Sequence, residues 1–282
     1  TVSYSLEGLN IAVDCANGSA SRTAKRLFDA LGATTHMLSD APDGLNINCN
    51  CGSTHMEALK AYVRENHLDA GVAFDGDAYR CLMVDENGNE IDGDMIMAIC
   101  ALDMKSRGKL NKNTVVGTIM TNPGFIKFCE REGIRFIATK VGDRFVMEEM
   151  LLEEYSFGGE QSGHLIFGDF ATTGDGTLTA LTLCNEVVKS GKSLKELAAD
   201  FPQLPQTLIN VPNVDKKAAS TNKRIQDAVA REEELLGDTG RVLLRPSGTE
   251  PLVRVMAEAA TQAYADEVCT RLAKIVAEEL AL

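Results

Sequence analysis

Apolar segments of strand length alternate with helical segments over residues 8–202, and glycines punctuate the changes. Strands are expected at residues 10–15, 35–38, 71–74, 114–118 and 135–139. Helical patterns lie between them, and one starts near Thr54 with Glu57 at capping-box spacing. Strand–helix alternation is typical of a mostly parallel sheet, because a parallel crossover needs a connection of helix length. The sequence therefore predicts an α/β fold whose ligands gather at the carboxyl ends of the strands.

The alternation changes near residue 202. Before it, Pro123 opens one helix, Asp143 is expected to cap another, and Gly176 ends the polar turn that starts a third. Residues 202–212 read as a linker, and the order beyond them is strand, helix, hairpin, helix. We therefore expect two consecutive α/β domains with mainly parallel mixed sheets, and a C-terminal α+β domain with a small antiparallel sheet. The expected domains are residues 1–102, 103–203 and 204–282.

Composition and charge exclude several classes of protein. A chain of 282 residues with 44% hydrophobic and 24% charged residues is folded rather than disordered. The net charge of −13 disfavours nucleic acids and anionic membranes as partners, since both attract clustered Lys and Arg. No apolar run approaches the ~20 residues of a membrane span, and the first residues lack the pattern of a signal peptide. Together with eight scattered cysteines, which favour reduced thiols, this predicts a cytoplasmic protein. Cys49, Cys51 and His55 could form part of a zinc site, but they lack a second ligand pair.

The segment from Arg245 to Arg254 concentrates hydrogen-bond donors. It holds two arginines, the hydroxyls of Ser247 and Thr249, and Gly248, which frees the backbone to turn. A phosphate dianion accepts hydrogen bonds from several directions, and guanidinium groups, hydroxyls and backbone amides can supply them. The same residues are equally typical of a hairpin turn with charged flanks. The segment alone leaves both interpretations open.

A second polar segment follows the apolar run that ends at Phe74. Asp75 and Asp77 flank Gly76, so two carboxylates can converge on one point of a tight turn. Oxygen ligands of this kind suit a hard divalent cation such as Mg²⁺. An acidic turn with solvated carboxylates is the alternative.

Two further segments complete a pattern with these two. They are Lys140-Val141-Gly142-Asp143-Arg144 and Gly159-Glu160-Gln161-Ser162-Gly163-His164. With the acidic turn and the arginine segment, in this order, they resemble the α-D-phosphohexomutase superfamily over essentially the whole chain. The resembled proteins have four domains, with a catalytic serine in a Ser-His-Asn-Pro context in the first. No Ser-His dipeptide occurs in this sequence, so it reads as the last three domains of such a protein.

The resemblance implies a role for each segment. Arg80 would neutralise a phosphoryl group in transfer, with Lys140 facing the same cleft. Asp75 and Asp77 would bind Mg²⁺, although the family's third aspartate is replaced here by Tyr79, a poor ligand at neutral pH that weakens the site. Residues expected to contact the phosphosugar are Glu160, Ser162, His164, Arg144, Arg245, Ser247, Gly248, Thr249 and Arg254. Purely structural roles remain open for several of these residues, such as a surface ion pair for Arg80 and a packing role for His164.

The implied activity is a phosphosugar mutase that interconverts glucosamine 6-phosphate and glucosamine 1-phosphate through a phosphoserine and a bisphosphorylated intermediate. The sequence around Gln161 favours glucosamine phosphate as the substrate. Mannose or glucose phosphates are alternative substrates, because the relevant enzymes share every loop type named above. A non-catalytic phosphosugar-binding module is an alternative of another class. The expected partners are a small phosphosugar and the missing N-terminal domain, without which this chain is expected to be inactive.

Overall fold

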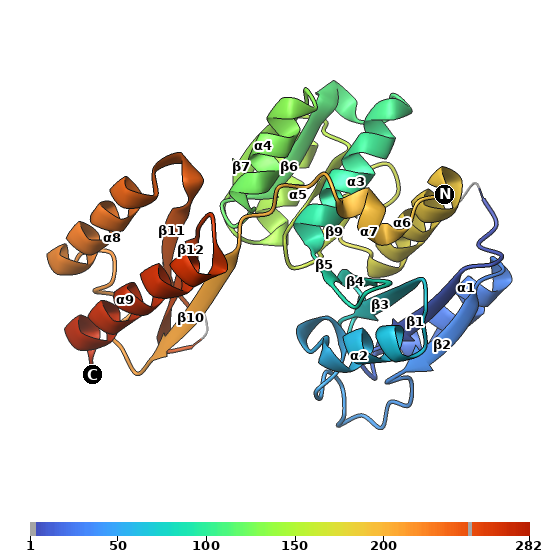
Figure 1. The fold of residues 1–282 in the computed structure, drawn as a ribbon, viewed down its shortest axis with the longest axis horizontal. Helices are drawn as coiled ribbons and strands as arrows, with labels where there is room; N and C mark the ends of the chain where they lie inside the picture. Colours follow the sequence, from blue (N-terminus) through green and yellow to red (C-terminus); the bar gives the residue numbers. More distant parts are fainter. Residues whose placement is uncertain (1–3, 248–249) are drawn as a thin grey trace. The chain divides into compact units, whose positions relative to one another are not determined.

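The computed structural model describes residues 4–247 and 250–282. These residues form two compact units (Figure 1). Unit 1 comprises residues 1–121 and 125–202, and unit 2 comprises residues 122–124 and 203–282.

The first sheet of unit 1 has five strands in the order β2-β1-β3-β4-β5. Its strands are β1 (Asn10–Asp14), β2 (Thr34–Leu38), β3 (Ala70–Phe74), β4 (Cys81–Asp85) and β5 (Glu90–Ile91), with helices α1 (Ala24–Ala30) and α2 (Glu57–Glu65). The first three strands are parallel, because α1 and α2 make the crossovers. By contrast, β4 turns back antiparallel to β3, so the β3–β4 connection is a hairpin loop at the carboxyl end of β3.

The second sheet of unit 1 has four strands in the order β7-β6-β8-β9. Its strands are β6 (Thr114–Thr118), β7 (Arg135–Thr139), β8 (Phe157–Gly159) and β9 (Leu165–Phe167), with helices α3 (Gly93–Ser106), α4 (Pro123–Arg131), α5 (Asp143–Leu152), α6 (Gly176–Ser190) and α7 (Leu194–Ala198). The strands β6, β7 and β8 are parallel, whereas β9 pairs antiparallel with β8. The β8–β9 loop is thus a second hairpin on the carboxyl side of a parallel strand.

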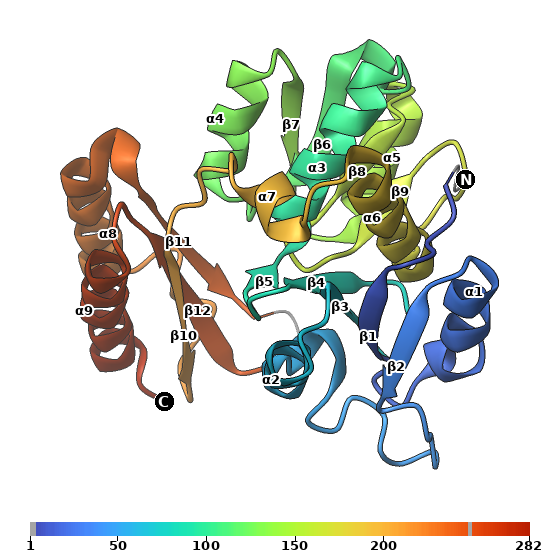
Figure 2. The ribbon, with the colours of Figure 1, turned by 45° about the vertical axis from the view of Figure 1, so that its right-hand side comes forward.

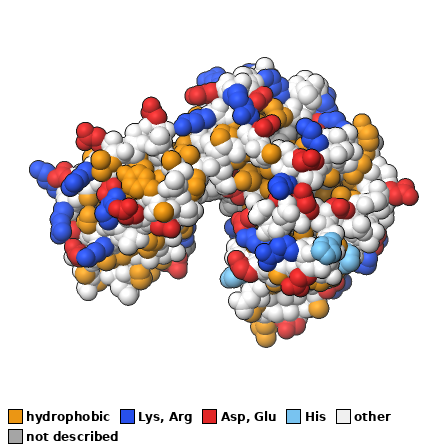
Figure 3. Space-filling view, in the orientation of Figure 1, with side chains coloured by type: hydrophobic (Ala, Val, Ile, Leu, Met, Phe, Trp, Pro, Cys, Tyr) orange, Lys and Arg blue, Asp and Glu red, His pale blue; other side chains and the backbone are white. Residues whose placement is uncertain are grey.

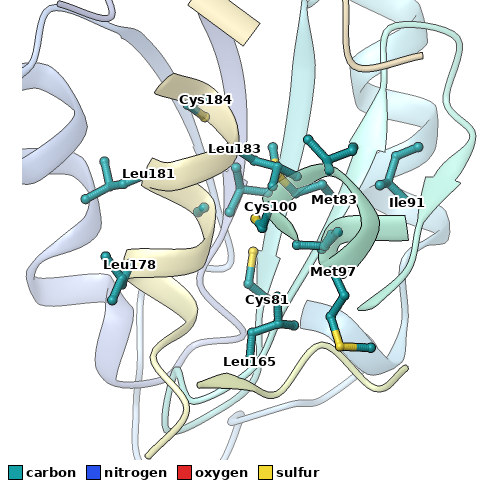
Figure 4. Close-up of a cluster of buried hydrophobic side chains, with 14 of the residues drawn as sticks. Cys81, Met83, Ile91, Met97, Cys100, Leu165, Leu178, Leu181, Leu183 and Cys184 are labelled. Atoms are coloured by element: carbon teal, nitrogen blue, oxygen red, sulfur yellow. The ribbon is translucent and has the colours of Figure 1, made fainter. Parts of the chain in front are cut away.

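One hydrophobic core joins the two sheets. Side chains from β4, α3, α6 and β9 point toward one another within it (Figure 4). Met97 and Cys100 of α3 are almost fully buried, and so are Leu183 and Cys184 of α6. A helix that is apolar on nearly all sides, as α3 is, has to be enclosed by protein. Each large side chain buried here contributes about 1.5–3 kcal/mol, so the shared core fixes the β3–β4 hairpin relative to the β8–β9 hairpin.

Unit 2 is a small antiparallel sheet with two helices. Its elements are β10 (Gln206–Pro212), α8 (Lys223–Leu236), β11 (Arg241–Pro246), β12 (Leu252–Glu258) and α9 (Gln262–Leu280), and the strand order is β10-β12-β11. Alternate residues of β12, Val253 and Val255, are fully buried and share a core with Val268, Leu272 and Val276 of α9. The period of two on the strand and of four on the helix brings these residues together. The views in Figures 1 and 2 both show α8 and α9 beside this sheet.

The predicted fold class is confirmed, and three local expectations are wrong. Thr54 and Glu57 form no capping box, because residues 52–54 are a 3₁₀ turn and the Thr54 hydroxyl bonds to His55. Asp143 is the first residue of α5 rather than its cap, and the cap residue, Gly142, has no side chain to donate or accept. The expected linker is largely strand β10, whose apolar residues Ile209 and Val211 pack on unit 2.

One face of the molecule carries side chains of both charges (Figure 3). On the face drawn in Figure 3, acidic and basic side chains are interspersed over each unit. Within the described residues, no helix has both the length and the apolar composition needed to cross a bilayer. Each of the eight cysteines carries a free thiol.

Candidate functional site

The β3–β4 and β8–β9 loops lie side by side in unit 1. Arg80 and His164 form an antiparallel bridge, and the Cys81 amide donates to the Gly163 carbonyl at 3.0 Å. The backbone therefore joins the segments that the sequence singled out for a cation and for a sugar.

The acidic loop is organised around Asp75. This carboxylate is only 4% exposed and accepts two hydrogen bonds from Arg80: from the backbone amide at 3.0 Å and from Nε at 2.6 Å. Burial of a charge is tolerated when it is paired and hydrogen-bonded in this way. The Arg80 side chain remains 41% exposed although its Nε is anchored on Asp75.

The acidic loop does not fit a cation held by three carboxylates. Both oxygens of Asp75 already accept from Arg80, and Asp77 is exposed. The Tyr79 ring lies edge-on to that of His164, with 6.3 Å between the ring centroids. Among residues 4–247 and 250–282, no group of three His, Cys, Asp or Glu side chains is placed to hold a metal. Asp75 and Asp77 are the carboxylates that this loop offers, and a Mg²⁺ bound by them would take its other oxygen ligands from water or from a phosphate.

The β8–β9 loop is tied to two neighbouring segments. Glu160 accepts from the Gly142 amide at 3.0 Å, which links the loop to the start of α5. The Gln161 carbonyl accepts from the Gly93 amide, and its side-chain amide donates to Asp92, whose pKa is raised by burial. Gln161, which the sequence associated with the choice of sugar, thus contacts the start of α3. Ser162 is exposed at the tip of the loop.

His164, the last residue of the β8–β9 loop, is buried. Its side chain is 8% exposed, and Nε2 lies 3.8 Å from a carboxylate oxygen of Asp143. Its Nδ1 is buried without a hydrogen-bond partner among the described residues. A buried ring nitrogen in this state can still accept from or donate to a ligand.

Lys140 and Arg144 lie at the start of α5 and are both exposed. The Lys140 ammonium stands 5.8 Å from the centre of the Phe145 ring. Arg144 is engaged within its own helix, because Nε donates to Glu148 at 2.7 Å and this hydrogen bond raises the pKa of the guanidinium. The structure therefore gives Arg144 a partner in its own helix, whereas the printed contact of the Lys140 ammonium is with the Phe145 ring.

Two glycines at helix starts set the positions of these loops. A Cβ at Gly93 would lie 2.1 Å from the Glu160 carbonyl oxygen, and a Cβ at Gly176 would lie 2.5 Å from that of Arg80. Only glycine allows the helix to approach the loop so closely. The sequence analysis did not identify either glycine as part of the site, because each contact joins residues 67 or more positions apart (160 − 93 = 67; 176 − 80 = 96).

The arginine segment is the hairpin tip of unit 2, as expected. Arg245 and Arg254 are direct cross-strand partners on β11 and β12, so both side chains leave the same face. Like charges placed opposite each other repel, and an anion between them would relieve that repulsion. Ser247 is buried, and its hydroxyl accepts from the Glu250 amide at 3.2 Å. The expected contacts Gly248 and Thr249 lie outside the described residues.

Lys216 is a further cation at this hairpin. Its ammonium donates to the carbonyl oxygens of Ser247 at 2.7 Å and Glu250 at 3.0 Å. The sequence analysis missed it, since Lys216 is 31 residues from Ser247 and stands in a segment without a motif.

Three family models match the chain. They describe phosphoglucomutase/phosphomannomutase domain II at residues 2–88, domain III at residues 92–204, both alpha/beta/alpha, and the C-terminal domain at residues 208–275. Among solved structures, the chain is similar to Aspergillus fumigatus N-acetylphosphoglucosamine mutase in complex with GlcNAc-6P and magnesium. The TM-score is 0.81 at 22% identity over 96% of this chain and 62% of that one, a likeness that shows the fold alone.

Curated relatives are much closer in sequence. Phosphoglucosamine mutase of Bifidobacterium longum (strain DJO10A) is 71% identical over 98% of this chain, and that of Nocardioides sp. (strain ATCC BAA-499 / JS614) is 52% identical over 100%. The chain spans about 60% of the length of these relatives: 60% of the first and 63% of the second. With its fold, its loops and all three matching domains, the chain belongs to the phosphoglucomutase/phosphomannomutase family.

Proposed function

We propose that this chain belongs to a phosphosugar mutase, which is an isomerase, and that it binds the phosphate group of the substrate. The observation that carries the proposal is the opposed pair Arg245 and Arg254 at a hairpin tip whose carbonyls are held by Lys216. Three cations at one hairpin of a chain of net charge −13 concentrate positive charge locally, and such a concentration attracts an anion. The whole protein would act in the cytoplasm, in the synthesis of amino-sugar precursors of the cell wall.

The proposed substrate pair is glucosamine 6-phosphate and glucosamine 1-phosphate. The support comes from the relatives, which are named phosphoglucosamine mutases at up to 71% identity. Glu160, Ser162 and His164 would contact the sugar, because a fixed carboxylate, a hydroxyl and an unsatisfied imidazole nitrogen can discriminate among hydroxyl patterns. Mannose and glucose phosphates are the second candidates.

Some residues of the chain would hold the phosphate that does not react, and others would neutralise the charge of the phosphoryl group that is transferred. The hairpin at Arg245 to Arg254, with Gly248 and Thr249 included, would hold the phosphate that is not reacting. Arg80, anchored on Asp75, would face the transferring phosphoryl group, with Lys140 adding positive charge. Arg144 would contact the substrate only after its hydrogen bond to Glu148 breaks. The phosphoryl-carrying serine would come from the longer protein, since no Ser-His-Asn-Pro motif occurs in these residues.

Magnesium would supply charge neutralisation at the transferring phosphoryl group when it is bound. In this chain the affinity of Asp75 and Asp77 for Mg²⁺ is expected to be low, because Tyr79 adds no charge and Arg80 occupies Asp75. We also propose that the chain comprises three family domains, the last of them beginning near residue 203.

Titration with glucosamine 6-phosphate, followed by ¹H–¹⁵N NMR, tests the proposal. The Ser247 and Arg254 resonances should shift, and Arg245→Ala should weaken binding by about tenfold or more, since one charge-assisted hydrogen bond contributes about 1.5–3 kcal/mol. Arg231→Ala is the matched control, because Arg231 is an exposed arginine of the same unit. Mannose 6-phosphate and glucose 6-phosphate titrated in parallel would rank the sugars. If the shifted resonances lie outside this hairpin, or if both variants bind equally well, the hairpin is a charged turn and not a phosphate site.

Turnover separates the parts of the proposal. The purified chain, supplied with a catalytic amount of a hexose bisphosphate, should form no glucosamine 1-phosphate. Product formation by the chain itself would show that a residue within it carries the phosphoryl group.

A further inference from the structure

The tip of the β8–β9 loop is a tight turn. The Gly163 amide donates to the Glu160 carbonyl at 3.0 Å, so Gln161 and Ser162 occupy the two central positions of the turn. The Glu160 amide in turn donates to the His164 carbonyl at 3.1 Å. Bonds within the loop set its shape, whereas contacts with other segments set its position.

Gln161 binds the start of α3 with both its backbone and its side chain. Its carbonyl accepts from the Gly93 amide at 2.9 Å, and its side-chain amide donates to Oδ2 of Asp92 at 3.3 Å. The two backbones approach so closely that a Cβ at Gly93 would lie 2.1 Å from the Glu160 carbonyl oxygen. Gln161 is therefore held at two points, while the next residue, Ser162, remains exposed.

Asp92 is fixed independently of the loop. It is the N-cap of α3, because its Oδ1 accepts from the Met95 amide at 3.0 Å, and its other oxygen accepts from Gln161. The residue is only 9% exposed, and the helix behind it is enclosed in the core of unit 1. A buried carboxylate held by hydrogen bonds has little freedom to move, so it can locate a partner side chain.

The residues on either side of Gln161 are the proposed sugar contacts Glu160 and Ser162. The Glu160 carboxylate is itself directed by the Gly142 amide at the start of α5. Groups that recognise a ligand have to be held within about 0.5 Å of their working positions. A turn released from α3 would therefore misplace the carboxylate and the hydroxyl together.

We infer that Asp92 is a positioning residue of the sugar-binding loop: through Gln161 it places Glu160 and Ser162 for the sugar without contacting the sugar itself. The inference rests on the proposed function, because it assigns Asp92 to the sugar contacts proposed there. It also gives Gln161, which the sequence associated with glucosamine, a structural role, since its amide matches the carboxylate of Asp92.

The test exchanges donor and acceptor between the two side chains. At pH 8, well above the ordinary pKa of either carboxyl, Gln161→Glu places two acceptors of like charge opposite each other. Adding Asp92→Asn restores a donor, because the asparagine oxygen can still cap α3 while its amide nitrogen donates to the new carboxylate. Adding Glu90→Gln instead is the matched control. The charge of Glu90 is near enough to raise the pKa of Asp92, but its removal leaves the two acceptors facing each other.

Each variant is titrated by NMR with glucosamine 6-phosphate and, separately, with inorganic phosphate, which lacks the sugar. Gln161→Glu should weaken glucosamine 6-phosphate binding about fivefold, adding Asp92→Asn should recover most of that loss, and adding Glu90→Gln should not. The affinity for inorganic phosphate should be the same in all variants.

Several results would overturn the inference. Equal recovery with Glu90→Gln would reduce the pair to a general charge effect, and unchanged binding in Gln161→Glu would show that the contact does not matter. Parallel losses for inorganic phosphate would mean that the sugar is not involved. If Asp92→Asn restores the hydrogen-exchange protection of Ile99 in α3 but not sugar binding, the pair only stabilises the helix.

The unmodified chain separates this inference from the proposed function. Glucosamine 6-phosphate should shift resonances of residues 160–162 as well as those of the hairpin at Arg245 to Arg254. Shifts confined to the hairpin would overturn the inference and leave the phosphate site standing. If no resonance of either segment shifts, the proposed function itself fails.

Discussion

Gly176→Ala tests how the acidic loop is held in place. The new Cβ would lie 2.5 Å from the Arg80 carbonyl oxygen and 2.8 Å from that of Ala78, whereas ordinary contact begins at 3.4 Å. The loop or the start of α6 must therefore shift by about 0.9 Å (3.4 − 2.5), which is large for a packed interior. The loop cannot simply swing away, since the Gly176 amide donates to the Ala78 carbonyl at 2.9 Å.

The magnitude follows from these contacts. Overpacking of this kind costs about 1–3 kcal/mol. The higher helix propensity of alanine, worth about 1 kcal/mol in a helix interior, offsets only part of that cost. Gly191→Ala, at the other end of α6, is the control because its Cβ would meet nothing within 4 Å. Gly191 has φ of 68°, so this control also loses about 1–2 kcal/mol, but for a reason unrelated to the loop.

Native-state hydrogen exchange at Val72 and Met83 reports the free energy of unfolding of unit 1, and the NMR shifts of residues 75–81 report the loop. Both variants should lose stability, but only Gly176→Ala should shift the loop resonances and weaken glucosamine 6-phosphate binding. Unchanged loop resonances in Gly176→Ala would refute the reasoning, because the loop would then not depend on the close approach. Shifts of equal size in Gly191→Ala would do the same.

Three further predictions concern the acidic loop, the thiols and acid stability. Tyr79→Asp should tighten Mg²⁺ binding measurably by calorimetry whereas Tyr79→Phe should not, and equal heats for both would show that the loop is not the cation site. Burial raises the pKa of Cys15, Cys129 and Cys184 to about 12, so at pH 8 only exposed Cys49 should react rapidly with a thiol reagent; several fast-reacting thiols would contradict this. Burial alone would raise the pKa of Asp103, but hydrogen bonds from Arg107 and Lys189 outweigh it and lower the pKa below 3.8. The stabilisation from Asp103 is therefore present above pH 3.8 and lost as the pH falls through the lowered pKa, and Asp103→Asn should flatten the acid unfolding curve there while lowering stability at pH 7.

Local patterns predicted the strands far better than the helix starts. The expected strand bounds at residues 114–118 and 135–139 agree with β6 and β7, because short apolar runs between turn residues have few alternatives. The cap at Asp143 failed, because the N-cap position is occupied by Gly142, whose φ of 129° few other residues adopt, so Asp143 is already the first residue of the helix. The strand β10 was read as a linker because its buried face is set by a partner strand 40 or more residues later.

The sequence likewise predicted some features of the candidate site and missed others. Sequence motifs identified the residues that bear charge in each loop, such as Arg80 and Arg245. They did not reveal that both carboxylate oxygens of Asp75 accept hydrogen bonds from Arg80, or that Lys216 donates to two carbonyls of the hairpin. Those contacts depend on loop conformation and on chain segments distant in sequence, and residue type alone carries no information about either.

The core shared by the two sheets of unit 1 determines how the chain can be dissected. The expected boundary at residue 102 falls within α3, whose buried residues Met97 and Cys100 pack against α6 from the following segment. A fragment ending there would present that apolar face to water and should aggregate or fail to express. The smallest piece of unit 1 that can be studied alone therefore includes both sheets, and any engineered exchange between relatives should replace both of them together.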